Sequence, residues 1–112
     1  MSHVSVARKH QALLDAFLLI ENPQERLSAI LQRTRKIPAA ASEYCTDENR
    51  VDGCVSRVWI RATLAEDVCA FELQAESRLV ASLADLVCEP FHLSPPEGIL
   101  SWSGDLLLEL GI

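Results

Sequence analysis

The chain has 112 residues, of which 49% are hydrophobic, and a formal net charge of -6. A chain of this length forms one domain that buries about 65% of its unfolded surface, so its core needs no disulfide or metal. The negative charge argues against a nucleic-acid partner, which requires clustered Lys and Arg. The most apolar early stretch, residues 12–20, is too short for a membrane span and leads into no small-residue cleavage site of an export signal. We therefore expect a single domain over residues 1–112, located in the cytoplasm.

Two amphipathic helices are predicted in the first third of the chain. Apolar residues recur at three- and four-residue steps over residues 6–20, which is the spacing of one helix face. Asn22, followed by a proline, suits the N-cap of a second helix. Pro38 disfavours helical backbone in the residue before it, so this second helix is predicted to end near Ile37. A loop over residues 39–52 follows.

A hairpin and further helices are predicted in the second half. Apolar and polar residues alternate over residues 57–64 and 69–75, and the short segment between them suits the turn of an antiparallel hairpin. Ser77 can cap a third helix, and Ser94 opens a capping box for a short fourth one. The end of the chain is apolar and must pack or form an exposed patch, through which we expect self-association. Its apolar residues are Leu106, Leu107, Leu108, Leu110 and Ile112.

Cys54 is the cysteine whose surroundings favour chemistry. It follows Gly53 in the segment NRVDGCVSRVWI, residues 49–60, where a polar turn meets a β-branched and aromatic strand. Glycine adopts positive φ without steric cost, so this pattern predicts a thiol at a loop tip that a rigid strand holds. Cys69 and Cys88 lie inside the predicted strand and helix, where core packing is the better interpretation.

The sequence indicates neither a zinc site nor a catalytic triad. The four cysteines contain no C-x-x-C pair, so a structural zinc ion would need ligands scattered along the chain. The three histidines, His3, His10 and His92, show no arrangement of nucleophile and base. Cys45 lies in the polar loop before Cys54, at a separation that permits a disulfide between them.

The segment around Cys54 resembles the sulfur-acceptor motif of the SufE family, whose members assist cysteine desulfurases in iron-sulfur cluster assembly. The resemblance covers about residues 10–111. Its other matching parts are residues 22–31, Ile37-Pro38, residues 76–86 and residues 94–100.

The resemblance implies a fold and a function. The implied fold is α+β, with a small antiparallel β-sheet packed against α-helices. The implied function is sulfur transfer, in which Cys54 takes a sulfane sulfur from the persulfide of a cysteine desulfurase and accelerates its turnover. An iron-sulfur scaffold protein then receives the sulfur. The desulfurase is expected to carry pyridoxal phosphate, and no cofactor is expected on this chain itself.

Two features depart from the pattern of the family. Its members usually continue past the leucine-glycine pair near the end with a helical stretch that holds a proline-serine-arginine segment, whereas this chain stops at Ile112. Asp52 stands where many members carry proline or another neutral residue. We expect both departures to affect the efficiency of transfer more than the identity of the reaction.

The neighbours of Cys54 bear on its reactivity, because the thiolate is the nucleophile in persulfide transfer. One positive charge, from Arg50 or Arg57, at ~6 Å and an effective dielectric of ~40 favours the thiolate by roughly one pKa unit, and Asp52 opposes it by a similar amount. The residues expected to support the loop or to contact the partner are Arg50, Asp52, Gly53, Ser56 and Arg57.

Two alternatives to a sulfur carrier stay open at this point. One is a thiol redox enzyme or sensor that uses Cys54 together with Cys45. The other is a module that binds a desulfurase but no longer transfers sulfur. Val55 and Val58 are candidates to line an apolar recess for the sulfur, although anchoring of the strand is the simpler interpretation of Val58.

Overall fold

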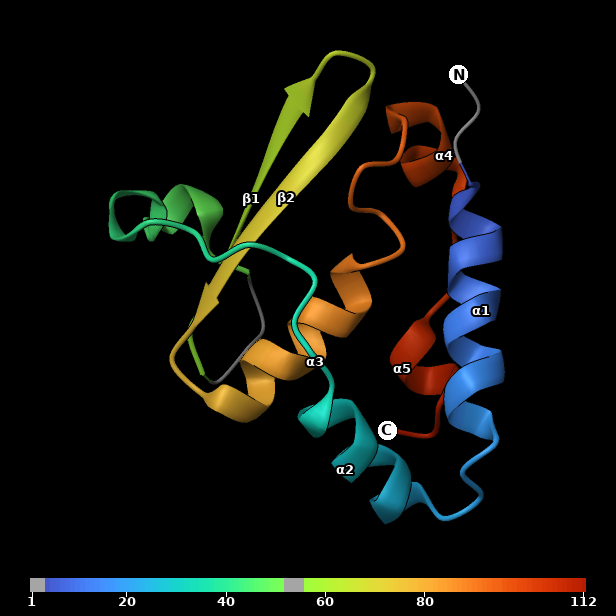
Figure 1. Ribbon diagram of the computed structural model, residues 1–112. Coiled ribbons are helices and arrows are strands. Elements are labelled where there is room, and N and C mark those ends of the chain that lie inside the picture. The colour runs from blue at the N-terminus through green and yellow to red at the C-terminus, as the bar shows by residue number, and fades with distance from the viewer. Residues whose placement is uncertain (1–3, 52–55) are drawn as a thin grey trace.

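The computed structural model describes residues 4–51 and 56–112, and this part of the chain forms five α-helices, two 3-10 turns and one hairpin (Figure 1). The elements are, in chain order, α1 (Val6–Leu18), α2 (Pro23–Gln32), η1 (Ser42–Tyr44), η2 (Asp47–Asn49), β1 (Val58–Ala65), β2 (Val68–Ala75), α3 (Arg78–Cys88), α4 (Pro96–Ser101) and α5 (Leu106–Glu109). α3 packs against both β2 and α2 and so joins the hairpin to the other helices. The predicted α+β fold is confirmed.

Side-chain caps begin the first two helices. α1 starts after Ser5, whose hydroxyl accepts the N–H of Arg8 at 3.2 Å. The Asn22 side chain accepts two backbone N–H groups at the start of α2, with Pro23 in the first helical position, and this cap is as predicted.

The second helix ends earlier than predicted. α2 stops at Gln32 and not near Ile37, because the backbone of Arg33 is already extended, with a ψ of 151°. The Asp85 carboxylate of α3 accepts the N–H groups of Lys36 and Ile37 at 2.9 to 3.2 Å. In a continued helix these N–H groups would bond to carbonyls four residues back. A charged acceptor on another helix replaces those carbonyls.

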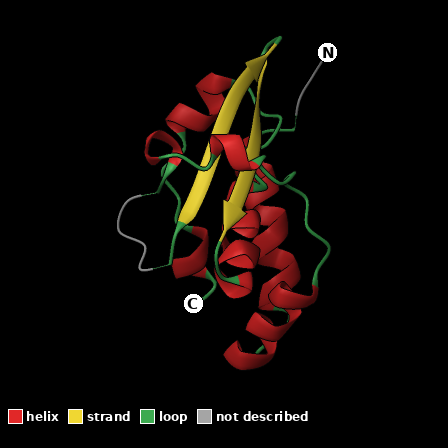
Figure 2. Ribbon diagram, turned by 90° about the vertical axis from the view of Figure 1, so that its left-hand side faces the viewer, coloured by secondary structure: helices red, strands yellow, loops and turns green. Residues whose placement is uncertain are grey.

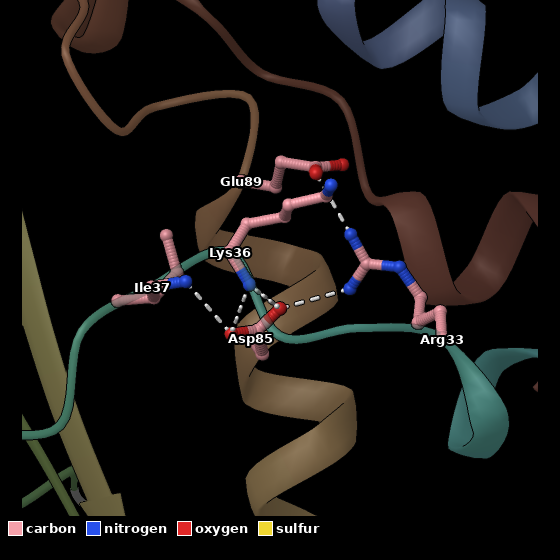
Figure 3. A network of polar contacts seen from close by, with 5 residues as sticks. All are labelled: Arg33, Lys36, Ile37, Asp85 and Glu89. Carbon is pink, nitrogen blue, oxygen red and sulfur yellow. Dashed lines mark hydrogen bonds and ion pairs between the residues drawn. The ribbon is translucent and has the colours of Figure 1, made fainter.

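Asp85 is the centre of a buried polar network (Figure 3). Its side chain is 1% exposed, and it binds the Arg33 guanidinium at 2.9 Å in addition to the two backbone N–H groups. The same guanidinium binds Glu89, the C-cap residue directly after α3, at 2.8 Å. Because a buried carboxylate is stable only when it is paired and hydrogen-bonded, this network fixes residues 33–37 against α3.

β1 and β2 pair along their whole length as the predicted antiparallel hairpin. Glu66 in the turn has a φ of 58°, a left-handed conformation that the sequence did not indicate, since no glycine is present. The apolar face of the hairpin places Leu73, which is 1% exposed, against Ile37 and Cys88. Figure 2 shows the two strands lying across the helices, with their turn at one end of the molecule.

The outer edge of β2 is covered by other parts of the chain. The backbone groups of Cys69 bond to the segment before α4, and those of Leu73 bond to the segment after α2. The N–H of Phe71 donates to Nδ1 of His92 at 3.0 Å. Burial, aided by the charge of Lys9 and opposed by that of Asp85, lowers the pKa of His92, which favours the neutral ring that this hydrogen bond requires. This edge therefore offers no template for another strand.

The predicted cap of the fourth helix is wrong. α4 has Pro95 at its N-cap position, without a side-chain cap. Ser94 is instead 0% exposed, and its hydroxyl donates to the Pro90 carbonyl at 2.9 Å and accepts from Nζ of Lys9 at 2.6 Å. The hydroxyl thus joins α1 to the end of α3, and a partner so distant in sequence cannot be predicted from local spacing.

The apolar end of the chain packs mainly inward. Leu106 and Leu110 are 5% and 0% exposed. They share a core cluster with Leu14 of α1, Ile30 of α2 and Leu86 of α3. Leu108 is 74% exposed, and self-association through this end of the chain stays a prediction.

Replacing Asp85 with alanine should lower the free energy of unfolding by about 3 to 5 kcal/mol, because the Arg33 guanidinium and two backbone N–H groups would lose their acceptor. Urea denaturation followed by circular dichroism measures the change. Glu89→Gln is the matched control, since it removes the more exposed partner of the same guanidinium and should cost less than about 1 kcal/mol. Equal losses in the two variants would contradict the central role of Asp85.

Candidate functional site

The segment that carries the candidate cysteine lies between two residues that the fold holds together. Asp52, Gly53, Cys54 and Val55 lie outside the described residues, so the predictions made for them stay predictions. On either side of them, the N–H of Val51 donates to the carbonyl of Val58 at 2.9 Å. Arg50 and Trp59 form an antiparallel bridge next to this bond. β1 therefore anchors both flanks of the segment at one place.

An apolar hollow of about 350 Å³ opens beside these flanks. Val51 and Val58 contribute to its lining from the two ends of the segment, while α3 and α5 contribute the rest of the wall together with Ile60. The remaining lining residues are Val80, Leu83, Ala84, Val87, Cys88 and Leu107. Val58 is 2% exposed at the start of β1, which fits anchoring of the strand, and it also lines this hollow. The use of the hollow as a recess for the sulfur stays a prediction.

Arg57 ties the segment to the start of α3. Its backbone N–H and its guanidinium both donate to the Glu76 carboxylate at 2.9 Å. This hydrogen bonding raises the pKa of Arg57 and lowers the pKa of Glu76, and the nearby charge of Arg50 lowers the latter further. The Arg57 guanidinium also lies 5.6 Å from the centre of the Trp59 ring. Support of the loop by Arg57 is consistent with these contacts, and a contact with a partner stays a prediction.

The three described cysteines differ in environment. Cys88 is 5% exposed, as predicted for a core residue, and burial, followed by the charge of Asp85, raises its pKa to about 11. Cys69 is half-buried in β2. Cys45 is half-buried at the end of η1, with its Sγ 3.8 Å from the carbonyl of Ala41. Cys88 is therefore unsuited to attack a persulfide at neutral pH.

Within residues 4–51 and 56–112, no group of three or more His, Cys, Asp or Glu side chains is placed to hold a metal ion. The described helices include none with the length and apolar character needed to cross a bilayer.

The described residues thus form a small α+β domain with an apolar hollow beside the two flanks of residues 52–55. The family model described as SufE: Fe-S metabolism associated domain matches residues 11–112. The chain belongs to the SufE family, and the resemblance found in the sequence is confirmed.

Several curated proteins are similar to this chain. SufE-like protein 1, chloroplastic/mitochondrial, of Arabidopsis thaliana is 29% identical over 105 residues, which are 93% of this chain and 28% of that protein. A SufE-like protein of Rhizobium etli is 25% identical over 91 residues, covering 78% of this chain and 62% of that protein. The chloroplastic quinolinate synthase of Nicotiana tabacum is 23% identical over 112 residues, covering 98% of this chain and 15% of that enzyme. The chain thus spans less than two thirds of each of these relatives.

Cys88 should resist alkylation in the folded protein, because a pKa of about 11 leaves very little thiolate at pH 8. Treatment with iodoacetamide at pH 8, followed by peptide mass spectrometry, should label Cys88 roughly 100-fold more slowly than Cys45. In urea the two rates should become similar. Equal labelling of the two cysteines in the native protein would contradict the burial of Cys88.

Proposed function

We propose that this chain is a cytoplasmic sulfur carrier that accepts sulfur on Cys54 from a cysteine desulfurase and passes it to an iron-sulfur scaffold protein. Membership of the SufE family over residues 11–112 supports a sulfur-acceptor role in iron-sulfur metabolism. The apolar hollow is the structural observation that supports Cys54 as the acceptor, since Val51 and Val58 line it from the two ends of the segment that holds this cysteine.

The proposed transfer is a thiol exchange. The Cys54 thiolate attacks the outer sulfur of the desulfurase persulfide, the sulfur-sulfur bond of that persulfide breaks, and the desulfurase cysteine leaves as a thiolate. Cys54 then carries the persulfide, and no net oxidation or reduction has occurred. Pyridoxal phosphate belongs to the desulfurase and generates its persulfide.

The charged residues near Cys54 affect how readily its thiolate forms. Arg57 shares its charge with Glu76, so its field at a neighbouring thiol is weaker than that of an unpaired cation. Arg50 forms no ion pair with another described residue, but its charge also acts on the Glu76 carboxylate. Since Asp52 opposes both arginines, we propose that docking of the desulfurase completes the activation of the thiol.

The hollow gives a bound sulfur a place away from water. A persulfide in solvent is open to reductants and to stepwise oxidation. The described residues in the wall of the hollow are aliphatic apart from Cys88, and that thiol stays protonated at neutral pH because its pKa is raised to about 11. The neighbouring cysteine is therefore a poor competitor for the carried sulfur.

The redox alternative depends on a bond between Cys45 and Cys54. Cys45 is half-buried, and its thiol lies at the carbonyl of Ala41 in the turn that it ends. No contact of the described residues directs this thiol toward Val51 or Ser56, the residues that flank the segment. We therefore favour a carrier with one active cysteine.

Incubation with a cysteine desulfurase, pyridoxal phosphate and cysteine should add one sulfur, about 32 Da, to Cys54, because this thiol is the proposed acceptor. Peptide mass spectrometry locates the added mass. Cys54→Ser should take up no sulfur, while Cys45→Ser should match the wild type.

Two other outcomes would contradict the proposal. A Cys45 to Cys54 disulfide in the wild type under mild peroxide, together with no sulfur uptake by the wild type, would favour the redox alternative. Desulfurase binding without any sulfur uptake by the wild type would favour the interaction module.

A further inference from the structure

A groove of about 360 Å³ lies between α2 and α3, separate from the apolar hollow. It is lined by Ser28, Leu31 and Gln32 of α2 and by Arg78, Leu79 and Ser82 of α3. Leu79 is 45% exposed although it lies on a helix with a strongly apolar face. The groove therefore combines apolar contact area with hydroxyl and amide groups, and it holds an arginine, a residue type that is enriched at protein interfaces.

Arg78 is the one charged side chain among the described residues that line this groove. It is exposed and forms no ion pair with another described residue, whereas Arg33, Arg57 and Arg61 each bind a carboxylate. The whole chain is acidic, with 16 acidic and 10 basic residues. The described lining of the groove, in contrast, holds one arginine and no carboxylate, so this part of the surface is positively charged. Such a site fits a partner segment that carries a carboxylate beside an apolar side chain.

The first two turns of α3 separate the groove from the hollow. Leu79 and Ser82 line the groove, while Val80 and Leu83 line the hollow on the adjacent face of the same helix. Glu76, just before α3, binds Arg57 on the flank of the cysteine-bearing segment. A protein seated in the groove would therefore lie beside the site of sulfur transfer.

We propose that the groove around Arg78 is a docking site for an acidic segment of the cysteine desulfurase. The inference rests on the proposed function and adds to it the place and the charge of the contact. A second copy of this chain is a poorer occupant, because two molecules with a net charge of -6 repel each other. Docking here brings the partner to the edge of the hollow without occupying the hollow itself.

The test reverses one charge without disturbing the helix. Arg78 is the first residue of α3, where a glutamate is favoured by the helix dipole, so Arg78→Glu should fold normally. Arg8→Glu is the matched control, since Arg8 is also an exposed arginine in the first turn of a helix but lies on α1 and does not line the groove. Circular dichroism and thermal unfolding confirm the folding of both variants.

The measurement is the Kd for a purified cysteine desulfurase from the organism that makes this chain, determined by calorimetry, with sulfur uptake on Cys54 measured in parallel. Arg78→Glu should raise the Kd by at least about tenfold, while Arg8→Glu should change it by less than about twofold. At saturating desulfurase, Arg78→Glu should still accept sulfur, because the acceptor cysteine is unchanged.

Each other outcome overturns a distinct claim. If the wild type accepts sulfur and Arg78→Glu binds as tightly as the wild type, the docking site is wrong and the proposed function stands. If both charge reversals weaken binding equally, the attraction is spread over the whole chain, and the groove has no special role. If Arg78→Glu changes self-association instead, the occupant is a second copy. If the wild type neither binds nor accepts sulfur, the proposed function fails and the docking site fails with it.

Discussion

The buried carboxylate of Asp85 is the constraint on which the arrangement of the hairpin depends. By accepting the N–H groups of Lys36 and Ile37, it ends α2 early and holds the following segment on α3. That segment then bonds to β2, where the Pro38 carbonyl accepts the N–H of Leu73 and the N–H of Ala40 donates back to the Leu73 carbonyl. One carboxylate thus connects α2, α3 and the hairpin.

The position of the hairpin in turn creates the hollow. Val51 and Val58 form one wall because β1 holds them together, and α3 forms the facing wall. α3 therefore has three roles along its short length: it holds Asp85, it borders the hollow, and it presents Arg78 and Leu79 on its outer face. A sulfur carrier needs a sheltered place for its cargo and a surface for its donor, and one helix contributes to both in the function proposed for this chain.

Local sequence predicted those parts of the structure that local spacing controls. Helical spacing predicted α1 and α3, and alternation predicted the hairpin, because each pattern reports which face is buried. The end of α2 and the role of Ser94 were predicted wrongly, since Asp85 holds the segment after α2 and Lys9 binds Ser94, and both partners are distant in sequence. The burial of Asp85 could have been inferred from the sequence, because this acidic residue stands beside Leu86 on the apolar face of α3. The motif around Cys54 was found by resemblance, whereas the hollow could not be predicted because Val51, Val87 and Leu107 meet only in the folded chain.

The proposed function requires Cys54 to take sulfur from a cysteine desulfurase, and the turnover rate of the desulfurase shows whether this happens. The measurement is the release of alanine from cysteine by the purified desulfurase at fixed concentration of reductant, with and without this chain. We expect the wild-type chain to raise the rate several-fold, whereas Cys54→Ser, at the same concentration and equally folded, should leave the rate at its basal value. An equal rise with both proteins, or no rise with either, would contradict the proposed function.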